Sequence, residues 1–203
     1  MGCLRLIKDS IDKLLYEYNK DPNNFFNEHD FQHCFFYIAH SIFDDKSISL
    51  LHPEYPTRKR FIREKSEDDK YSIGKHSFPL DKKLGRRGHY DFVVLNSKFY
   101  NDYHINNLEK LSNKTVMINK DINYKYIDIA IEFKFITKNL NINEIEFDLF
   151  KLNEAEEVKA KLLIVFIRKG IPHFDEFYNK IQNLEKGKVE VQILTSKTGS
   201  MRR

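Results

Sequence analysis

Two carboxylates and a lysine occur in apolar surroundings, where a charged side chain is costly to bury. Asp91 lies within the run HYDFVVL, and Glu132 and Lys134 lie within IAIEFKFI. A buried carboxylate costs free energy unless it is paired, hydrogen-bonded or coordinated to a metal. Carboxylate oxygens suit Mg²⁺, which shares its coordination sphere with substrate phosphate. The set indicates metal-assisted phosphate chemistry, in which the lysine orients or deprotonates water or stabilises negative charge.

A strand predicted over residues 126–136 places Glu132 and Lys134 side by side, because strand side chains alternate between two faces. The odd-numbered positions from Ile127 to Phe135 are all apolar, which is typical of a core face. We expect this strand to be central in a sheet, with the Asp91 strand next to it. The simpler alternative is a half-exposed strand that carries an ion pair.

This arrangement resembles the PD-(D/E)xK nucleases, the restriction-endonuclease-like enzymes. The resemblance covers residues 28–168 and rests on Asp91, on Glu132-Phe133-Lys134 in the next strong strand, and on the helix and buried strand that follow. It implies an α/β fold, namely a three-layer α/β/α sandwich with a central mixed β-sheet. It also implies Mg²⁺, with Mn²⁺ as a substitute, and hydrolysis of phosphodiester bonds in DNA. Tyr90 replaces the proline of the family name, and the long gap between Asp91 and Glu132 implies an insertion.

The resemblance also assigns roles to individual residues. Asp91 and Glu132 would bind the metal together with the backbone carbonyl of Phe133, and Lys134 would be the catalytic lysine. Many members carry an acidic residue on an early core helix, and Glu28 is the candidate here. The position of Glu28 at the start of a predicted helix has a simpler explanation, an interaction with the helix dipole.

Basic side chains gather in two segments that we expect to be loops, and one cluster directly precedes the Asp91 strand. Arginine and lysine often contact phosphate groups of nucleic acid. Lys151 lies one helical turn from Asp148, on the helix that in the family often lines the substrate groove. A solvated surface and a solvated i,i+3 ion pair are the alternatives. The residues expected to contact nucleic acid are Arg58, Lys59, Arg60, Arg86, Arg87 and Lys151.

The elements that must position these residues follow from the hydrophobic periodicity. From residue 126 onward, strands alternate with helices, which favours parallel strand pairing with helices covering the sheet. The two earlier strands could form a hairpin-like extension. Asn143 and Glu146 have the spacing of a capping box. Helices are predicted over 3–19, 28–43, 143–158 and 174–184, strands over 48–55, 89–95, 126–136, 161–168 and 189–194, and charged loops over 57–88 and 96–125.

Composition limits the class of protein. The 203 residues are 41% hydrophobic and 32% charged, which suits a single domain over 1–203 with a frayed C-terminal tail. No apolar run approaches the roughly 20 residues of a membrane span. The charged N-terminus and the two cysteines are typical of a cytoplasmic protein without a membrane partner. The net charge of +4 permits nucleic-acid binding without requiring it.

We therefore expect a DNA nuclease, and one site per chain favours a homodimer if both strands of a duplex are cut. Two alternatives remain open at this point. One is a nucleic-acid-binding or assembly module on the same fold, in which Asp91, Glu132 and Lys134 form a buried, non-catalytic ion-pair cluster. The other is a metal-dependent phosphatase or nucleotide hydrolase that acts on small substrates.

Overall fold

A mixed β-sheet forms the centre of the computed structural model, which describes residues 2–43, 50–63, 71–74, 86–99, 125–137, 141–168 and 170–195. Its six strands lie in the order β2-β1-β3-β4-β5-β6. β1 pairs antiparallel with β2 and β3, and β3 pairs antiparallel with β4, whereas β4, β5 and β6 are parallel. The predicted parallel half and the hairpin-like extension are both confirmed. The strands are β1 (Leu51–Arg63), β2 (Tyr71–Gly74), β3 (Arg86–Leu95), β4 (Ile127–Ile136), β5 (Val158–Ile167) and β6 (Glu190–Thr195).

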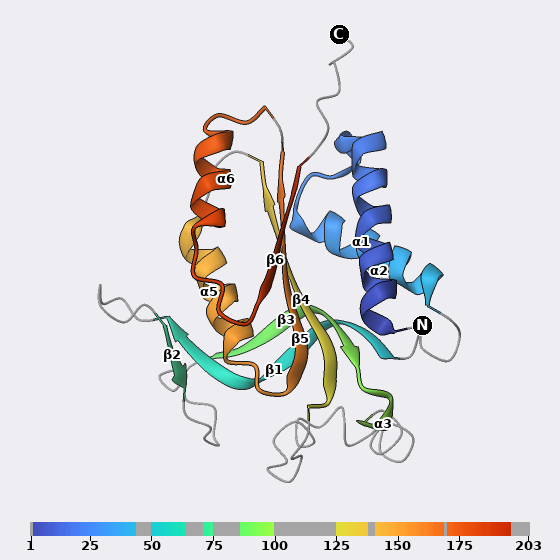
Figure 1. Ribbon diagram of the computed structural model, residues 1–203, viewed down its shortest axis with the longest axis vertical. Helices are drawn as coiled ribbons and strands as arrows, with labels where there is room; N and C mark the ends of the chain where they lie inside the picture. Colours follow the sequence, from blue (N-terminus) through green and yellow to red (C-terminus); the bar gives the residue numbers. More distant parts are fainter. Residues whose placement is uncertain are drawn as a thin grey trace.

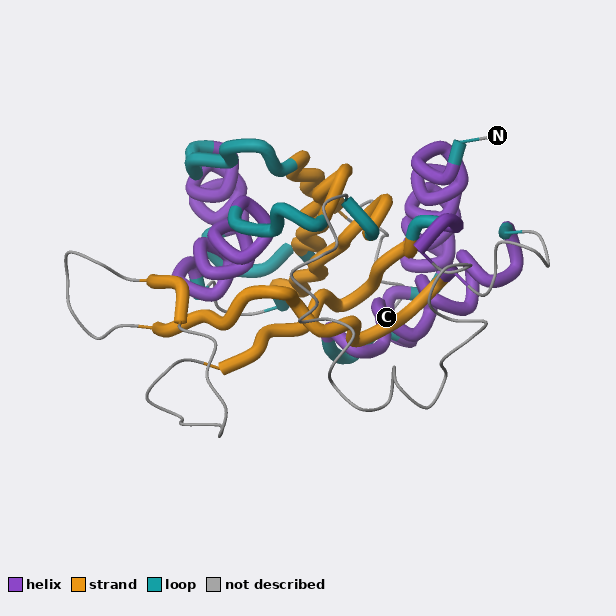
Figure 2. The backbone as a smooth tube through the Cα atoms, turned by 90° about the horizontal axis from the view of Figure 1, so that it is seen from below, coloured by secondary structure: helices purple, strands orange, loops and turns teal. Residues whose placement is uncertain are grey.

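Helices cover both faces of the sheet, with α1 and α2 on one side and α5 and α6 on the other (Figure 1). Figure 2 shows the strands between these two groups of helices from below. The α/β class expected from the sequence is confirmed. No described helix is both long and apolar enough to cross a membrane. The helices are α1 (Cys3–Lys20), the 3-10 turn η1 (Pro22–Asn24), α2 (Glu28–Ile42), the short α3 (Ser97–Phe99), α5 (Ile142–Asn153) and α6 (Phe174–Gln182).

The core beneath α1 and α2 is rich in aromatic side chains. The ring of Phe31 on α2 lies 4.5 Å from that of Phe135, and the ring of Phe35 lies 5.1 Å from that of Phe133. The odd-numbered residues of β4 therefore face α2, as the alternation predicts. Since Glu132 is even-numbered, its side chain points to the opposite face, which α5 covers.

The start and the length of α5 differ from the prediction. The helix begins at Ile142 after Asn141, whose side chain makes no capping hydrogen bond, so the predicted capping box at Asn143 is wrong. It ends at Asn153 because a tight turn must lead into β5, which begins at Val158. A capping box is present instead at α2, where the side chain of Asn27 accepts from the N–H of Asp30 and the Asp30 carboxylate accepts in return.

The loop predicted over 57–88 is wrong at both ends and in its middle, because these parts belong to β1, β2 and β3. Pro53 and Pro56 suggested the end of a strand, but both lie in the β1–β3 ladder, opposite Phe92 and His89. The register shifts after Pro56, where the buried Thr57 hydroxyl donates to backbone carbonyl oxygens. Most of the loop predicted over 96–125 and the C-terminal tail lie outside the described residues.

Candidate functional site

Asp91 lies at the point where β3 separates from β4. The last described pair of the ladder at this end joins Phe92 and Ile131. One residue further, Oδ2 of Asp91 accepts a hydrogen bond of 2.6 Å from the backbone N–H of Phe133. The N–H and C=O groups of a strand residue point to the same edge. The Phe133 carbonyl, an expected metal ligand, is therefore on the same edge of β4 as the Asp91 carboxylate.

Glu132 is almost completely buried, at 1% exposure, on the α5 side of the sheet. The ammonium of Lys151 lies 2.7 Å from its Oε1 atom. Burial raises the pKa of Glu132; the charge of Lys151 opposes that rise, and the charge of Asp91 adds to it. Asp91 is thus close enough to Glu132 for its negative charge to raise the pKa of Glu132.

Lys134 joins carboxylates from both layers of helices. Its Nζ lies 2.9 Å from Oδ2 of Asp148 on α5 and 3.2 Å from Oε1 of Glu28 on α2. Burial lowers the pKa of Lys134, but the charges of Asp148 and Glu28 outweigh burial and raise the pKa above its ordinary value. The side chain is therefore a stable ammonium ion that can orient a water or stabilise negative charge, but is poorly suited to accept a proton.

Lys151 lies inside the protein, at 5% exposure, rather than at the nucleic-acid surface expected from the sequence. Besides Glu132, its Nζ contacts Oδ1 of Asp148 at 3.1 Å and donates to the carbonyl of His89 at 2.8 Å. Two carboxylates and one backbone carbonyl thus surround the Lys151 ammonium. It is not available to phosphate in this arrangement, because packing turns the Asp148–Lys151 pair inward.

The two basic segments become neighbours in the sheet. Arg60 is the register partner of Arg87, and Arg86 pairs with the residue after Arg60. Lys59 forms ion pairs with Glu154 at 3.1 Å and with Glu156 at 3.0 Å. For Arg58, Arg60, Arg86 and Arg87 the structure describes the backbone but not the side chain.

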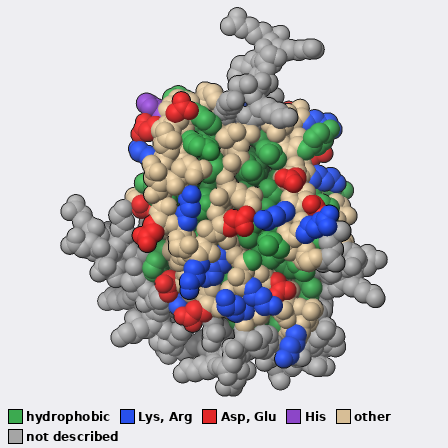
Figure 3. All heavy atoms as spheres, viewed as in Figure 1, with side chains coloured by type: hydrophobic (Ala, Val, Ile, Leu, Met, Phe, Trp, Pro, Cys, Tyr) green, Lys and Arg blue, Asp and Glu red, His purple; other side chains and the backbone are tan. Residues whose placement is uncertain are grey.

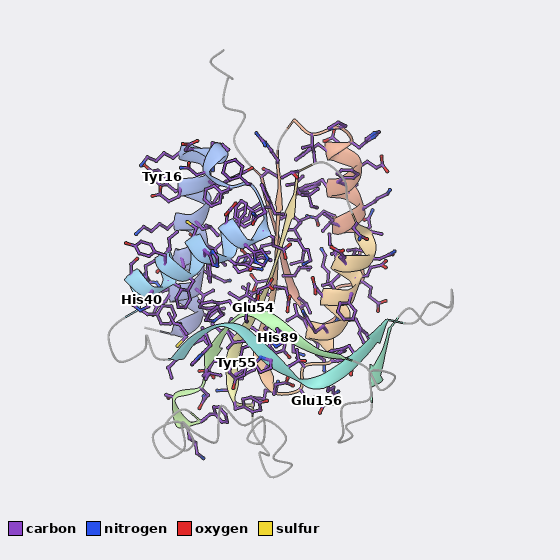
Figure 4. All side chains as sticks on the ribbon, turned by 180° about the vertical axis from the view of Figure 1, so that it is seen from behind. Tyr16, His40, Glu54, Tyr55, His89 and Glu156 are labelled. Carbon is purple, nitrogen blue, oxygen red and sulfur yellow. The ribbon has the colours of Figure 1, made fainter. Side chains whose placement is uncertain are left out.

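A pocket of about 450 Å³ opens beside Asp91, between α2 and β1. Glu54 lies opposite Asp91, between the ladder pairs Pro53–Phe92 and Tyr55–Tyr90, and has a left-handed backbone with φ of 51°. Figure 4 labels Glu54 on β1 and His89 on β3 in this region. Burial raises the pKa of Asp91 to about 6, although the hydrogen bond from Phe133 and the charges of Lys134 and Lys151 lower it. The pocket is lined by His29, Gln32, His33, Phe36, Pro53, Glu54 and Asp91.

Two members of the site, Asp148 and Lys151, were not among the predicted catalytic residues. Asp148 bridges Lys134 and Lys151. Beside the site, the Tyr90 hydroxyl donates to Oε1 of the buried Glu157 at 2.9 Å. The sequence offered one signal, the i,i+3 spacing of Asp148 and Lys151, which does not distinguish a buried pair from a solvated one. All four predicted catalytic residues, Glu28, Asp91, Glu132 and Lys134, belong to the same cluster.

The donors fit Mg²⁺ in kind, because carboxylates and a backbone carbonyl are hard oxygen ligands. Oε1 of Glu132 and Oδ2 of Asp148 are buried and have ionic contacts, but they receive no directed hydrogen bond within the described part of the chain. However, no three His, Cys, Asp or Glu side chains of the described residues are gathered closely enough to hold a metal together. Oε1 of Glu132 would have to exchange Lys151 for the cation in order to bind it.

Comparison with known proteins gives no match to a family model, to a curated protein or to a solved structure. The case for a function therefore rests on the geometry of the cluster formed by Glu28, Asp91, Glu132, Lys134, Asp148 and Lys151.

Proposed function

We propose that the protein is a divalent-metal-dependent nuclease with a restriction-endonuclease-like fold that hydrolyses phosphodiester bonds in DNA. The observation that supports this proposal best is the meeting of Asp91, Glu132 and Lys134 where β3 separates from β4. Two carboxylates and a stable ammonium meet here, beside an edge of β4 that no described strand pairs with beyond Ile131 on the β3 side. This combination suits hydrolysis of a phosphate ester.

Each residue would have a distinct task. Asp91, Glu132 and the Phe133 carbonyl would hold Mg²⁺, which when bound lowers the pKa of its water and neutralises phosphate charge. The Lys134 ammonium would orient the attacking water or stabilise the negative charge that develops on the phosphate. Glu28 and Asp148 hold Nζ of Lys134 from opposite sides, so its position is fixed before substrate binds.

The basic segments of β1 and β3 support a nucleic-acid substrate. The register brings Arg60 beside Arg87, four residues along β3 from Asp91. Such a concentration of cations would contact the phosphate backbone and position the duplex without reading its sequence. A chain with one site would cut both strands of a duplex as a homodimer.

The test is cleavage of supercoiled plasmid, single-stranded DNA and RNA with Mg²⁺ or Mn²⁺, with wild type, Glu132→Ala and Lys134→Ala compared. We expect metal-dependent cutting that falls at least 100-fold in both variants and stops in EDTA. Glu132→Gln serves as a milder companion, because removal of a buried charge can destabilise the fold, and thermal unfolding checks each variant. Glu176→Gln, an exposed carboxylate on α6, is the control. Undiminished cutting by both alanine variants would exclude this site.

A second function, a nucleic-acid-binding or assembly module without catalysis, is supported by the Lys151–Glu132 contact. In this case the lysine is the permanent partner of a buried carboxylate, and no metal replaces it. Mn²⁺ titration by calorimetry separates the two proposals. The nuclease requires Mn²⁺ binding that Asp91→Asn and Glu132→Gln weaken at least tenfold, whereas the module requires none that depends on these residues.

A further inference from the structure

Three lysines lie where the parallel strands begin, at the carboxyl end of α5. Lys125 precedes β4, Lys161 lies near the start of β5 and Lys188 precedes β6. Parallel strands begin at the same edge of a sheet, so the three residues share one end of the molecule. Figure 3 shows Lys and Arg side chains gathered with carboxylates on the lower part of the face that β6 crosses in Figure 1. We call Lys125, Lys161 and Lys188 the strand-end lysines.

Asn153, the last residue of α5, fixes the backbone around this cluster. The Lys161 ammonium donates to the Asn153 carbonyl at 3.0 Å, and the backbone N–H of Lys188 donates to Asn153 Oδ1 at 2.8 Å. The Asn153 amide donates in turn to the carbonyl of Lys186 at 3.3 Å. One side chain thus holds the turn before β6 against the end of α5.

Gly187 allows the turn to come this close. Its φ of 55° lies in the left-handed region, and a Cβ atom at this position would overlap the side chain of Asn153. A residue with a side chain would be strained in this conformation and would also displace Asn153. The positions of Lys186 and Lys188 are therefore determined by the fold.

Among the described residues, the strand-end lysines differ from neighbouring basic residues in having no carboxylate within ion-pair distance. Lys59 is paired with Glu154 and Glu156, and Lys159 lies 2.6 Å from Asp128. In the described part of the chain no carboxylate lies within 4 Å of the ammonium groups of the strand-end lysines. Burial lowers the pKa of Lys161, and the charges of Lys125 and Lys188 lower it further, whereas the charges of Glu157 and Glu154 oppose part of this shift. Positive charge is therefore concentrated here at a cost, which a bound anion would relieve.

The cluster lies on the same side of the sheet as the candidate site. Lys161 is the register partner of Ala130, which precedes Glu132 on the α5 face of β4. Neighbours in register point to the same face of a sheet. A polyanion held at the strand-end lysines would therefore extend along the side of the sheet that carries Glu132 and Lys134.

We propose that the strand-end lysines bind the phosphodiester backbone of nucleic acid, as a second contact region of the substrate. The choice of ligand rests on the proposed nuclease function. Unpaired lysines act as point charges toward phosphate and carry no sequence information. The region therefore supplies affinity and orientation, whereas any sequence preference has to come from elsewhere in the protein.

The test is binding of a fluorescent 30-base-pair duplex to the full chain in EDTA, over a range of salt concentrations. The double variant Lys125→Gln/Lys188→Gln is compared with Lys13→Gln/Lys180→Gln, which removes the same charge from α1 and α6. Loss of two phosphate contacts lowers the slope of log K against log salt by roughly 2 and weakens binding at least tenfold near 0.1 M salt. The control double variant should keep the wild-type slope.

Equal losses in the two double variants, or a wild-type slope in the first, would overturn the inference. Failure of wild type to bind duplex at low salt would also overturn it. Because the assay contains no metal and does not measure cutting, it is independent of the cleavage test. If the wild-type protein cuts DNA but Lys125→Gln/Lys188→Gln binds duplex as wild type does, the contact region is refuted and the nuclease function is not. If the double variant binds more weakly but the wild-type protein cuts no substrate, the nuclease function is refuted and the contact region is not.

Discussion

The ammonium of Lys151 lies 2.7 Å from Oε1 of Glu132, and the two side chains are 7% and 2% exposed. One charge comes from α5 and the other from β4, so the pair joins a helix to the centre of the sheet. Removal of one partner from a buried ion pair leaves an uncompensated charge and costs about 3–5 kcal/mol. The contact also bears on the two proposed functions, because the nuclease needs Glu132 to bind a metal, whereas the module keeps Lys151 as the partner of Glu132.

A double-mutant cycle on this pair is the first prediction. Lys151→Met should destabilise the protein by about 3 kcal/mol because it leaves the Glu132 carboxylate buried without its cation. Glu132→Gln should cost less, since Lys151 keeps Asp148 and the His89 carbonyl as partners. The double variant should lose at least about 1.5 kcal/mol less than the sum of the single variants. Urea unfolding at pH 7 measures all three, and additivity within about 0.5 kcal/mol would show that the pair is not coupled.

Asp91→Asn is predicted to stabilise the protein at high pH. Burial raises the pKa of Asp91 to about 6, from 3.8 for the unfolded chain. The stability that this group contributes is complete below pH 4 and is lost as the pH rises through 6. The asparagine variant lacks this loss, and its amide oxygen can still accept from the Phe133 N–H. At pH 8 the variant should be more stable than wild type by up to about 3 kcal/mol.

The measurement for Asp91→Asn is the difference in unfolding free energy between variant and wild type at pH 4, 6 and 8. This difference cancels the titration of other groups. It should grow from near zero at pH 4 to its full value at pH 8. A difference that is constant with pH, or a less stable variant at pH 8, would contradict the raised pKa. If Asp91→Asn is more stable than wild type but binds Mn²⁺ more weakly, Asp91 lowers stability in exchange for function.

Lys134→Met is predicted to separate metal binding from cleavage. The Lys134 ammonium contacts Glu28 and Asp148 rather than Asp91 or Glu132, so its removal takes away no expected metal ligand. Mn²⁺ should bind with wild-type affinity or more tightly, because a nearby positive charge is gone. Cleavage should fall at least 100-fold, which corresponds to about 2.7 kcal/mol of transition-state stabilisation. A tenfold or greater loss of Mn²⁺ affinity would instead assign Lys134 a role in forming the metal site.

The sequence predicts the centre of the fold better than its edges. The apolar runs of β4 and β5 are long because both faces of these strands are covered, so their pattern is unambiguous. The early part of β1 contains Pro53 and Pro56, and local rules for proline suggest that a strand ends there. Pairing with β3 overrides that local preference. The end of α5 was also misjudged, because the turn before Val158 has no glycine or proline to mark it.

Alternation along β4 was enough to predict that Glu132 and Lys134 share a face. The expectation that Asp91 lies close to them came from its apolar strand and from the resemblance to the nuclease family. The burial of Asp148 and Lys151 could not be predicted in this way. Two opposite charges one helical turn apart have the same spacing on a solvated face and in a core. Only the packing of α5 against β4 shows that both side chains point inward. The pairing that neutralises Glu132 is therefore a tertiary property of the fold.

Gly187→Ala and Gly170→Ala form a matched pair for the last prediction. Both glycines have positive φ, 55° and 87°, so alanine is strained at either position by about 1–2 kcal/mol. Among the described residues, no atom lies within 4 Å of a Cβ built at Gly170, whereas one built at Gly187 overlaps Asn153. Gly187→Ala should therefore cost at least about 1 kcal/mol more than Gly170→Ala, because it also breaks the Asn153 hydrogen bonds.

Urea unfolding of the two alanine variants, alone and combined with Asn153→Ala, measures this contact. In the Asn153→Ala background the overlap is gone, so Gly187→Ala should cost no more than Gly170→Ala. The extra cost at Gly187 is then the energy with which Asn153 holds the turn before β6. If the extra cost persists without the Asn153 side chain, the turn is held by other contacts, and Asn153 does not organise the strand-end lysines.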